Sequence, residues 1–173
     1  MRNFHPAPTQ TLSTVPVRTI VTSFEQEFVG LDLRARSLVN TTPFEIFYHA
    51  PDKTVLTSPS VGELVLRGAG VVEQTCGGLT ANLWDDPFEW TLPETLSTPA
   101  RVYEYLDEVE QTRRNAFARF LNDRDLEKLI ATPAGDAQPL VSLLLDTLLR
   151  AGGYQARAAV ILTLLVRVNS PVV

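Results

Sequence analysis

Apolar residues recur every three or four positions along four separate stretches of the chain. These stretches cover residues 16–40, 60–77, 99–121 and 139–168. Such spacing places the apolar side chains on one face of a helix. No stretch has the strong apolar–polar alternation of a strand. The pattern therefore predicts an all-α chain, in which four helices form an up-down bundle joined by long crossover loops.

Short motifs mark the ends of these helices. Ser60 followed by Glu63 is a capping box, in which the serine accepts a backbone N–H and the glutamate reaches back. The glycine pair at 77–78 predicts the end of the same helix. Thr98 before a proline is typical of a helix start. Glycines inside the second helix weaken its intrinsic helicity, so we expect them to allow a neighbour to approach closely.

The connections lead to weaker predictions. Residues 44–50, FEIFYHA, are expected to form one helical turn. The loop 82–98 is expected to be a crossover held by Trp84, Phe88 and Trp90, or alternatively a lid or partner surface. Residues 125–132 read as a short strand or an extended link. We expect residues 1–14 to be an N-terminal arm and residues 15–173 to form one domain.

Composition narrows the range of functions. The chain has 173 residues, a net charge of −5 and one cysteine. An acidic chain without a dense basic run is a poor partner for nucleic acid or an anionic membrane. The single cysteine, Cys76, permits no internal disulfide and is expected to be a small semi-buried side chain. With no apolar signal-peptide core, the expected location is the cytoplasm.

The fourth stretch is the most apolar helix of the chain, and polar residues interrupt it. Arg150, Tyr154 and Arg157 share one face with Leu143, Thr147, Ile161 and Leu165. Because leucines and alanines occupy most of the remaining surface, we expect this helix to be buried on several sides. Buried arginines need partners. The face therefore predicts either a polar pocket or an internal ion-pair network.

Three segments resemble the DinB/YfiT-like superfamily of metal-dependent hydrolases, whose relatives include thiol-dependent S-transferases. They are SVGELVLRGAGVVEQ at 60–74, DDPFEWTLPETLSTPARVYEYLDEV at 85–109 and LLRAGGYQARAAVILTLL at 148–165. Together with the first helix, the likeness covers residues 15–168. The resemblance implies the bundle fold, a hydrolase or transferase activity, and assembly as a homodimer.

The metal ligands that the resemblance implies are missing. Family members with metal carry one histidine on the second helix and two on the fourth. Those positions fall at Arg67 and near Arg150 and Tyr154, with Gly153 as the register alternative. Arginine offers no lone pair and stays protonated, so it cannot hold a transition metal. We therefore expect a degenerate member of the family, with no metal and no cofactor.

The positions of the two histidines do not predict a metal site either. His5 lies in the arm and His49 in the first connection, and neither has a second histidine at ligand spacing. The charged residues of the third helix, among them Arg113 and Glu110, are expected to form a solvated face.

Two interpretations of the arginines stay open. In the first, Arg67, Arg150 and Arg157 pair with acids: Asp146 stands four residues before Arg150, and Glu27, Asp32 or Glu73 could supply other partners. In the second, Arg67, Arg150, Tyr154 and Arg157 form a pocket for a small anion, such as an organic acid, the carboxylate of a thiol cofactor or a phosphate.

Three functions follow from these interpretations. The first is binding of a small anion by a bundle that has lost its metal site. The second is the family's metal- or thiol-dependent hydrolase or S-transferase activity, although no catalytic constellation is visible in the sequence. The third is a homodimeric structural or interaction protein, with the glycine-bearing face of the second helix (Gly62, Gly68, Gly70) as a candidate interface.

Overall fold

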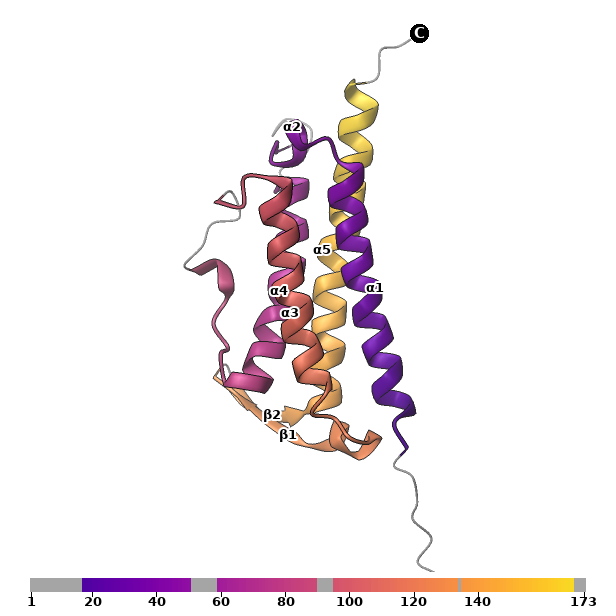
Figure 1. Cartoon of the computed structure of the whole chain (residues 1–173), viewed down its shortest axis with the longest axis vertical. Coiled ribbons are helices and arrows are strands. Elements are labelled where there is room, and N and C mark those ends of the chain that lie inside the picture. The colour runs from indigo at the N-terminus through magenta and orange to yellow at the C-terminus, as the bar shows by residue number, and fades with distance from the viewer. Residues whose placement is uncertain (1–16, 51–58, 90–94, 134, 170–173) are drawn as a thin grey trace, which may run out of the picture.

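The structure, a computed structural model, describes residues 17–50, 59–89, 95–133 and 135–169. Over these ranges the chain is mostly helical: four long helices lie side by side, and a small antiparallel hairpin lies at one end (Figure 1). The all-α prediction is confirmed in this broad form. The elements in chain order are α1 (Thr19–Thr41), α2 (Phe44–Phe47), α3 (Val61–Ala81), the 3-10 turn η1 (Pro87–Glu89), α4 (Pro99–Phe117), the 3-10 turn η3 (Asp123–Glu127), β1 (Leu129–Thr132), β2 (Gly135–Pro139) and α5 (Leu140–Asn169).

Some predictions concern residues outside these ranges. The arm at 1–14, with His5, and the aromatic anchor Trp90 are among them. The helical turn expected in the first connection is present as α2. The segment 125–132 contains the end of η3 and the whole of β1, so its second half is a strand, as one of the two alternatives expected.

Helix α3 begins where the sequence places its cap. The Ser60 hydroxyl accepts the backbone N–H of Glu63 at 3.2 Å. The Glu63 carboxylate does not reach back, because it accepts a hydrogen bond from Arg67 Nε at 3.0 Å. Only the serine half of the predicted capping box is therefore present.

The predicted end of α3 at the glycine pair is wrong. The helix continues to Ala81, and Asn82 follows with a left-handed backbone of φ 58°. Asparagine adopts this conformation more readily than most residues, so it can cap a helix as glycine does. Gly78 has a different role, since it lies beneath the ring of Trp84.

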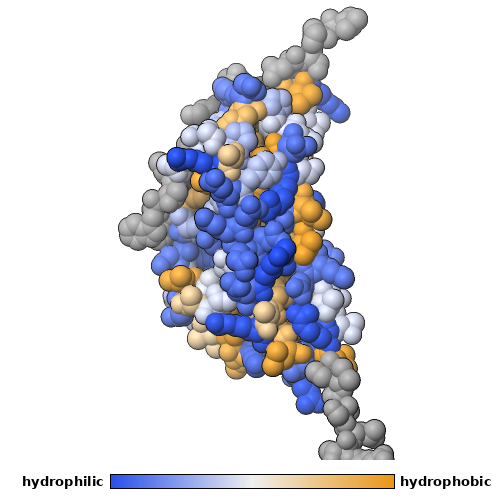
Figure 2. All heavy atoms as spheres, viewed as in Figure 1, coloured by the Kyte–Doolittle hydropathy of each residue, from blue (hydrophilic) through white to orange (hydrophobic). Residues whose placement is uncertain are grey.

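The helix that is buried on several sides is α3, and the same expectation for α5 is wrong. Buried residues lie on several sides of α3. In contrast, α5 exposes Leu149 by 75% and Val160 by 57%. Its buried stripe passes through Ala151 and Ala158, one step around the helix from the arginines. Figure 2 shows one face of the molecule, largely hydrophilic with separate apolar patches.

Glycines let neighbouring rings come close to the α3 backbone. A methyl group built on Gly62 would lie 2.5 Å from the Phe47 ring, and one on Gly70 would lie 2.8 Å from the Phe88 ring. On Gly78 it would lie 2.3 Å from Trp84. The expected close approach is confirmed. The same contacts cover this face of α3, so it is not free to form the homodimer interface considered above.

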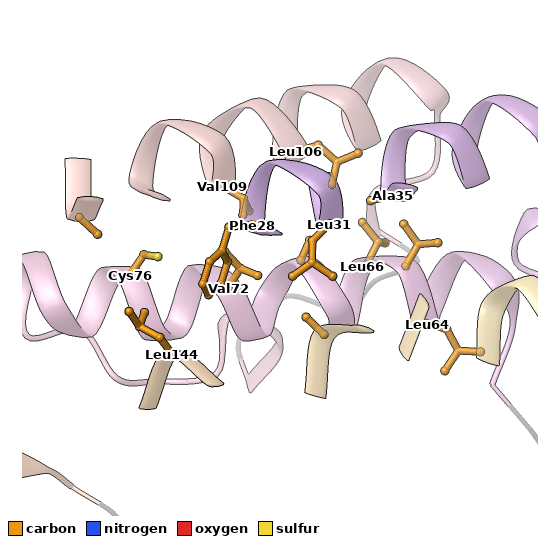
Figure 3. Close-up of a cluster of buried hydrophobic side chains, with 14 of the residues drawn as sticks. Phe28, Leu31, Ala35, Leu64, Leu66, Val72, Cys76, Leu106, Val109 and Leu144 are labelled. Atoms are coloured by element: carbon orange, nitrogen blue, oxygen red, sulfur yellow. The ribbon is translucent and has the colours of Figure 1, made fainter. Parts of the chain in front are cut away.

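The core lies where α1, α4 and α5 meet α3. In Figure 3, Phe28 and Leu31 of α1 lie near Val72 of α3, with Val109 of α4 beside them and Leu144 of α5 across the helix. All five side chains are buried. Burying a side chain of this size contributes roughly 1.5–3 kcal/mol.

Helix α4 departs from the sequence prediction in two places. Its cap is as expected, since Thr98 Oγ1 accepts the N–H of Arg101 at 3.3 Å. However, the helix ends at Phe117, and Leu121 is 69% exposed. Arg113, which was assigned to a solvated face, is 4% exposed. A strongly polar side chain therefore lies inside the helical assembly.

The ring contacts of α3 predict opposite effects for two glycine substitutions. Gly78→Ala forces a methyl group into the Trp84 ring and should lower the free energy of unfolding by about 1–3 kcal/mol. Gly153→Ala, in α5, meets no heavy atom within 4 Å and should raise it by about 0.5–1 kcal/mol. Urea unfolding measures both. Equal effects of the two substitutions would contradict this account of α3.

Candidate functional site

Three of the four residues predicted for the site line one hollow between α3 and α5. Arg67 comes from α3, and Arg150 and Tyr154 come from α5. The space has a volume of about 30 Å³ and so admits only a small group. We call it the outer hollow. Its other walls are Gly70, Val71 and Gln74 of α3 and Asp86 and Phe88 of the crossover.

Close packing of two backbones brings these residues together. A methyl group on Gly68 would lie 3.3 Å from the carbonyl oxygen of Ala151, so α3 and α5 nearly touch there. Arg67 and Arg150 immediately precede these two residues. Both arginine side chains therefore begin next to the Gly68–Ala151 contact. The structure does not bring Arg157 to the outer hollow, and its side chain is exposed.

Each arginine of the outer hollow has one acidic partner on its own helix. Arg67 Nε lies 3.0 Å from Glu63 Oε1, and Arg150 Nη1 lies 3.6 Å from Asp146 Oδ2. The predicted Asp146–Arg150 pair is confirmed, whereas Arg67 pairs with Glu63, which is not among the acids that the sequence analysis considered. Partly exposed pairs of this kind contribute about 1 kcal/mol or less. Most N–H donors of both arginines remain open to solvent or a ligand.

The three other acids considered as partners have different roles. Asp32 lies 2.8 Å from Arg36, both on α1. Glu73 accepts a hydrogen bond from Tyr105, and Glu27 is exposed. The acid that does line the outer hollow is Asp86, whose Oδ1 accepts the backbone N–H of Phe88 at 2.9 Å.

A second, larger hollow adjoins the first. It has a volume of about 260 Å³ and shares Gln74 and Arg150 with the outer hollow. Its further walls include Trp84 and the hairpin. Gln74 Nε2 donates to the Trp84 carbonyl at 2.7 Å and so fixes the crossover. An elongated ligand could place an anionic end at Arg150 and an apolar body against Trp84.

Cysteine and histidine give no reactive centre in the described ranges. Burial raises the pKa of the Cys76 thiol to about 12, against the opposing effect of the Arg113 charge. A thiol with this pKa stays protonated and is a poor nucleophile near neutral pH. His49 is exposed. Over the part of the chain that the structure describes, no three or more His, Cys, Asp or Glu side chains are grouped to hold a metal ion.

A buried acid pair that the sequence did not reveal joins α3 to α4. Tyr105 Oη donates to Glu73 Oε2 at 2.7 Å. Burial raises the pKa of Glu73, the hydrogen bond from Tyr105 opposes this rise, and the charge of Glu108 adds to it. The pKa of Tyr105 is raised well above its ordinary value, first by burial and then by Glu73. No sequence spacing could have found the pair, because its members are on different helices.

Comparison of the chain with family models, curated proteins and solved structures finds no match. The DinB/YfiT-like resemblance therefore stays a prediction from the sequence. None of the described helices is both long and apolar enough to cross a membrane.

Glu73→Gln should change how stability depends on pH. The raised pKa means that folded Glu73 holds its proton to higher pH than the unfolded chain does. The contribution of protonated Glu73 to the free energy of unfolding is therefore complete below its pKa in the unfolded chain. That contribution is lost as pH rises through its pKa in the folded protein. Glutamine stays neutral, so the variant should gain stability relative to the parent as pH rises. Urea unfolding across pH 4–8 measures the difference.

The control is Glu104→Gln, which removes an exposed charge from α4 near the Glu73–Tyr105 pair. This variant should keep the parental pH dependence. A constant stability difference between Glu73→Gln and the parent at every pH would contradict the assigned burial of Glu73.

Proposed function

We propose that this chain is a DinB-like four-helix bundle protein without the metal triad, and that it binds a small anion in the outer hollow. One observation carries the proposal: Arg67, Arg150 and Tyr154 line a single hollow, at the positions that correspond to the metal ligands of the resembling family. The proposed location of the protein is the cytoplasm.

The chemistry of these side chains favours a carboxylate or phosphate. Guanidinium groups match the geometry of both and stay charged at any physiological pH. The Tyr154 hydroxyl can donate to a ligand oxygen. Two arginines would also repel a divalent cation. The Asp86 carboxylate lies in the same hollow and would accept an ammonium group, if the ligand carries one beside its anionic end.

The alternative is the metal- or thiol-dependent hydrolase or S-transferase activity of the family. It ranks below binding, because arginines and a tyrosine occupy the positions of the metal ligands and Cys76 is buried. A chemical role for Arg150 or Tyr154 would have to use them as donors that stabilise a developing negative charge.

A homodimer is a second candidate, with an interface other than the one first considered. Apolar side chains project from α1 and α5: Leu33 is 61% exposed, and Leu149 is 75% exposed. Light scattering measures the mass in solution. A dimer that Leu149→Gln converts to a monomer would support an α5 interface, and a monomeric parent would exclude it.

Arg150→Ala should abolish binding of the small anion while leaving the fold intact. The parent, screened by thermal shift with acetate, citrate, phosphate and glutathione, should be stabilised by at least one of them. Arg150→Ala removes the half-exposed guanidinium that lines the outer hollow.

The matched control is Arg157→Ala, which removes the same charge from the same helix outside the hollow. It should bind as the parent does. The proposal fails if no anion stabilises the parent, or if both alanine variants weaken binding equally.

A further inference from the structure

Arg113 of α4 lies inside the helical assembly with most of its hydrogen-bonding capacity unused. Its side chain is 5% exposed. Nε and Nη1 are buried, and neither has a hydrogen-bond partner among the described residues. Burying an ionised donor without an acceptor costs several kcal/mol. In folded proteins such a group normally donates to a protein acceptor, an ordered water or an ion.

The nearest carboxylate is already engaged. Glu110 Oε1 lies 3.9 Å from Arg113 Nη2, beyond hydrogen-bond distance. The same oxygen accepts from Arg114 Nη2, and Glu110 Oε2 accepts from Arg36 Nη2 at 3.4 Å. One carboxylate therefore serves three guanidinium groups.

The acids around Arg113 are paired mainly with other arginines. Arg36 also lies 2.8 Å from Asp32 and 2.8 Å from Asp107. Arg34 Nε reaches Gln155 Oε1 at 3.3 Å. Without Arg34, whose partner is the neutral Gln155, the ion-paired group holds three guanidiniums and three carboxylates, and Arg113 is the guanidinium among them without an acid at hydrogen-bond distance. Its members are Arg36, Arg113, Arg114, Asp32, Asp107 and Glu110.

Arg113 lines an inner cavity where all four long helices meet. Phe28 and Asp32 of α1, Val72 of α3, Glu110 of α4 and Gln155 of α5 are among its walls. The positions of Phe28 and Val72 can be followed in Figure 3. The cavity has a volume of about 20 Å³ and admits about one water-sized group.

The other polar neighbours cannot supply the missing acceptor. Gln155 Nε2 donates to the Leu31 carbonyl at 2.8 Å, and its Oε1 accepts from Arg34. The charge of Arg113 lowers the pKa of Cys76, but burial raises this pKa by more, so Cys76 remains a neutral thiol. The carboxylates of Asp32 and Glu110 are held by Arg36 and Arg114.

We propose that the inner cavity is a binding site for one small monovalent anion, of the size of a halide or formate, held by Arg113. Such an ion would accept from the unused Nε and Nη1 donors. It would also give the Arg113 guanidinium a directly hydrogen-bonded negative charge, which Glu110 at 3.9 Å does not supply. The site is separate from the outer hollow, so either proposal can fail without the other.

The test compares the parent with Arg113→Met and with Arg114→Met. Methionine is a flexible apolar side chain of similar reach. Arg114 shares the Glu110 carboxylate but is exposed, so its variant controls for loss of an ion pair. Thermal unfolding is measured at constant ionic strength while sodium gluconate is replaced by sodium chloride, bromide or formate.

The parent and Arg114→Met should gain thermal stability saturably, by about 5–10 °C at roughly 100-fold excess of the anion over its Kd. Arg113→Met should lose this saturable gain. Identical responses of the parent and Arg113→Met would overturn the proposal, as would no saturable gain in the parent.

A second measurement decides the matter if Arg113→Met does not fold. Crystals of the parent protein soaked in sodium bromide should give an anomalous peak within hydrogen-bond distance of Arg113 Nε or Nη1. Density for a water molecule at that point without an anomalous signal would show that a neutral acceptor fills the cavity, and the anion site would be rejected.

Discussion

Contact between the α3 backbone and the side chains of its neighbours is the constraint on which the rest of the structure depends. At Gly62, Gly70 and Gly78 an aromatic ring occupies the space where a side chain would lie. The contacts at Gly70 and Gly78 fix the crossover along α3, and therefore place Asp86 and Phe88 in the wall of the outer hollow. Close packing of this kind tolerates no added methyl group. The candidate binding surface therefore depends on Gly70 and Gly78.

The helices were predictable because apolar periodicity is a local property. The start of α3 at Ser60 and the start of α4 after Thr98 follow from hydrogen bonds between residues three apart. The end of α3 was not predictable from its glycines, because Gly78 packs against the ring of Trp84, a residue outside the helix. The relative burial of α3 and α5 was also missed. Valine and glycine are less hydrophobic as a set than leucine, yet their small size lets more neighbours surround a helix.

The candidate sites divide in the same way. Helical spacing correctly paired Arg150 with Asp146 and placed Tyr154 on the same edge of α5. The inner cavity could not be foreseen, since Arg113 stands among acids and arginines that read as a solvated face. Which of two adjacent arginines is buried depends on the rotation of α4 against α1 and α3. Arg113 is buried and Arg114 is exposed. Because of this difference, the Nε and Nη1 donors of Arg113 lie buried without an acceptor among the described residues.

The most direct test of the central proposal observes the guanidinium groups themselves. In proton–nitrogen correlation spectra of the arginine Nε–H groups, assigned by single substitutions, the protein is titrated with acetate and with phosphate. The account predicts that the Arg67 and Arg150 signals move together and saturate at the same concentration, while the Arg157 signal stays in place. Movement of Arg157 in step with them, or no saturation at any arginine, would contradict it.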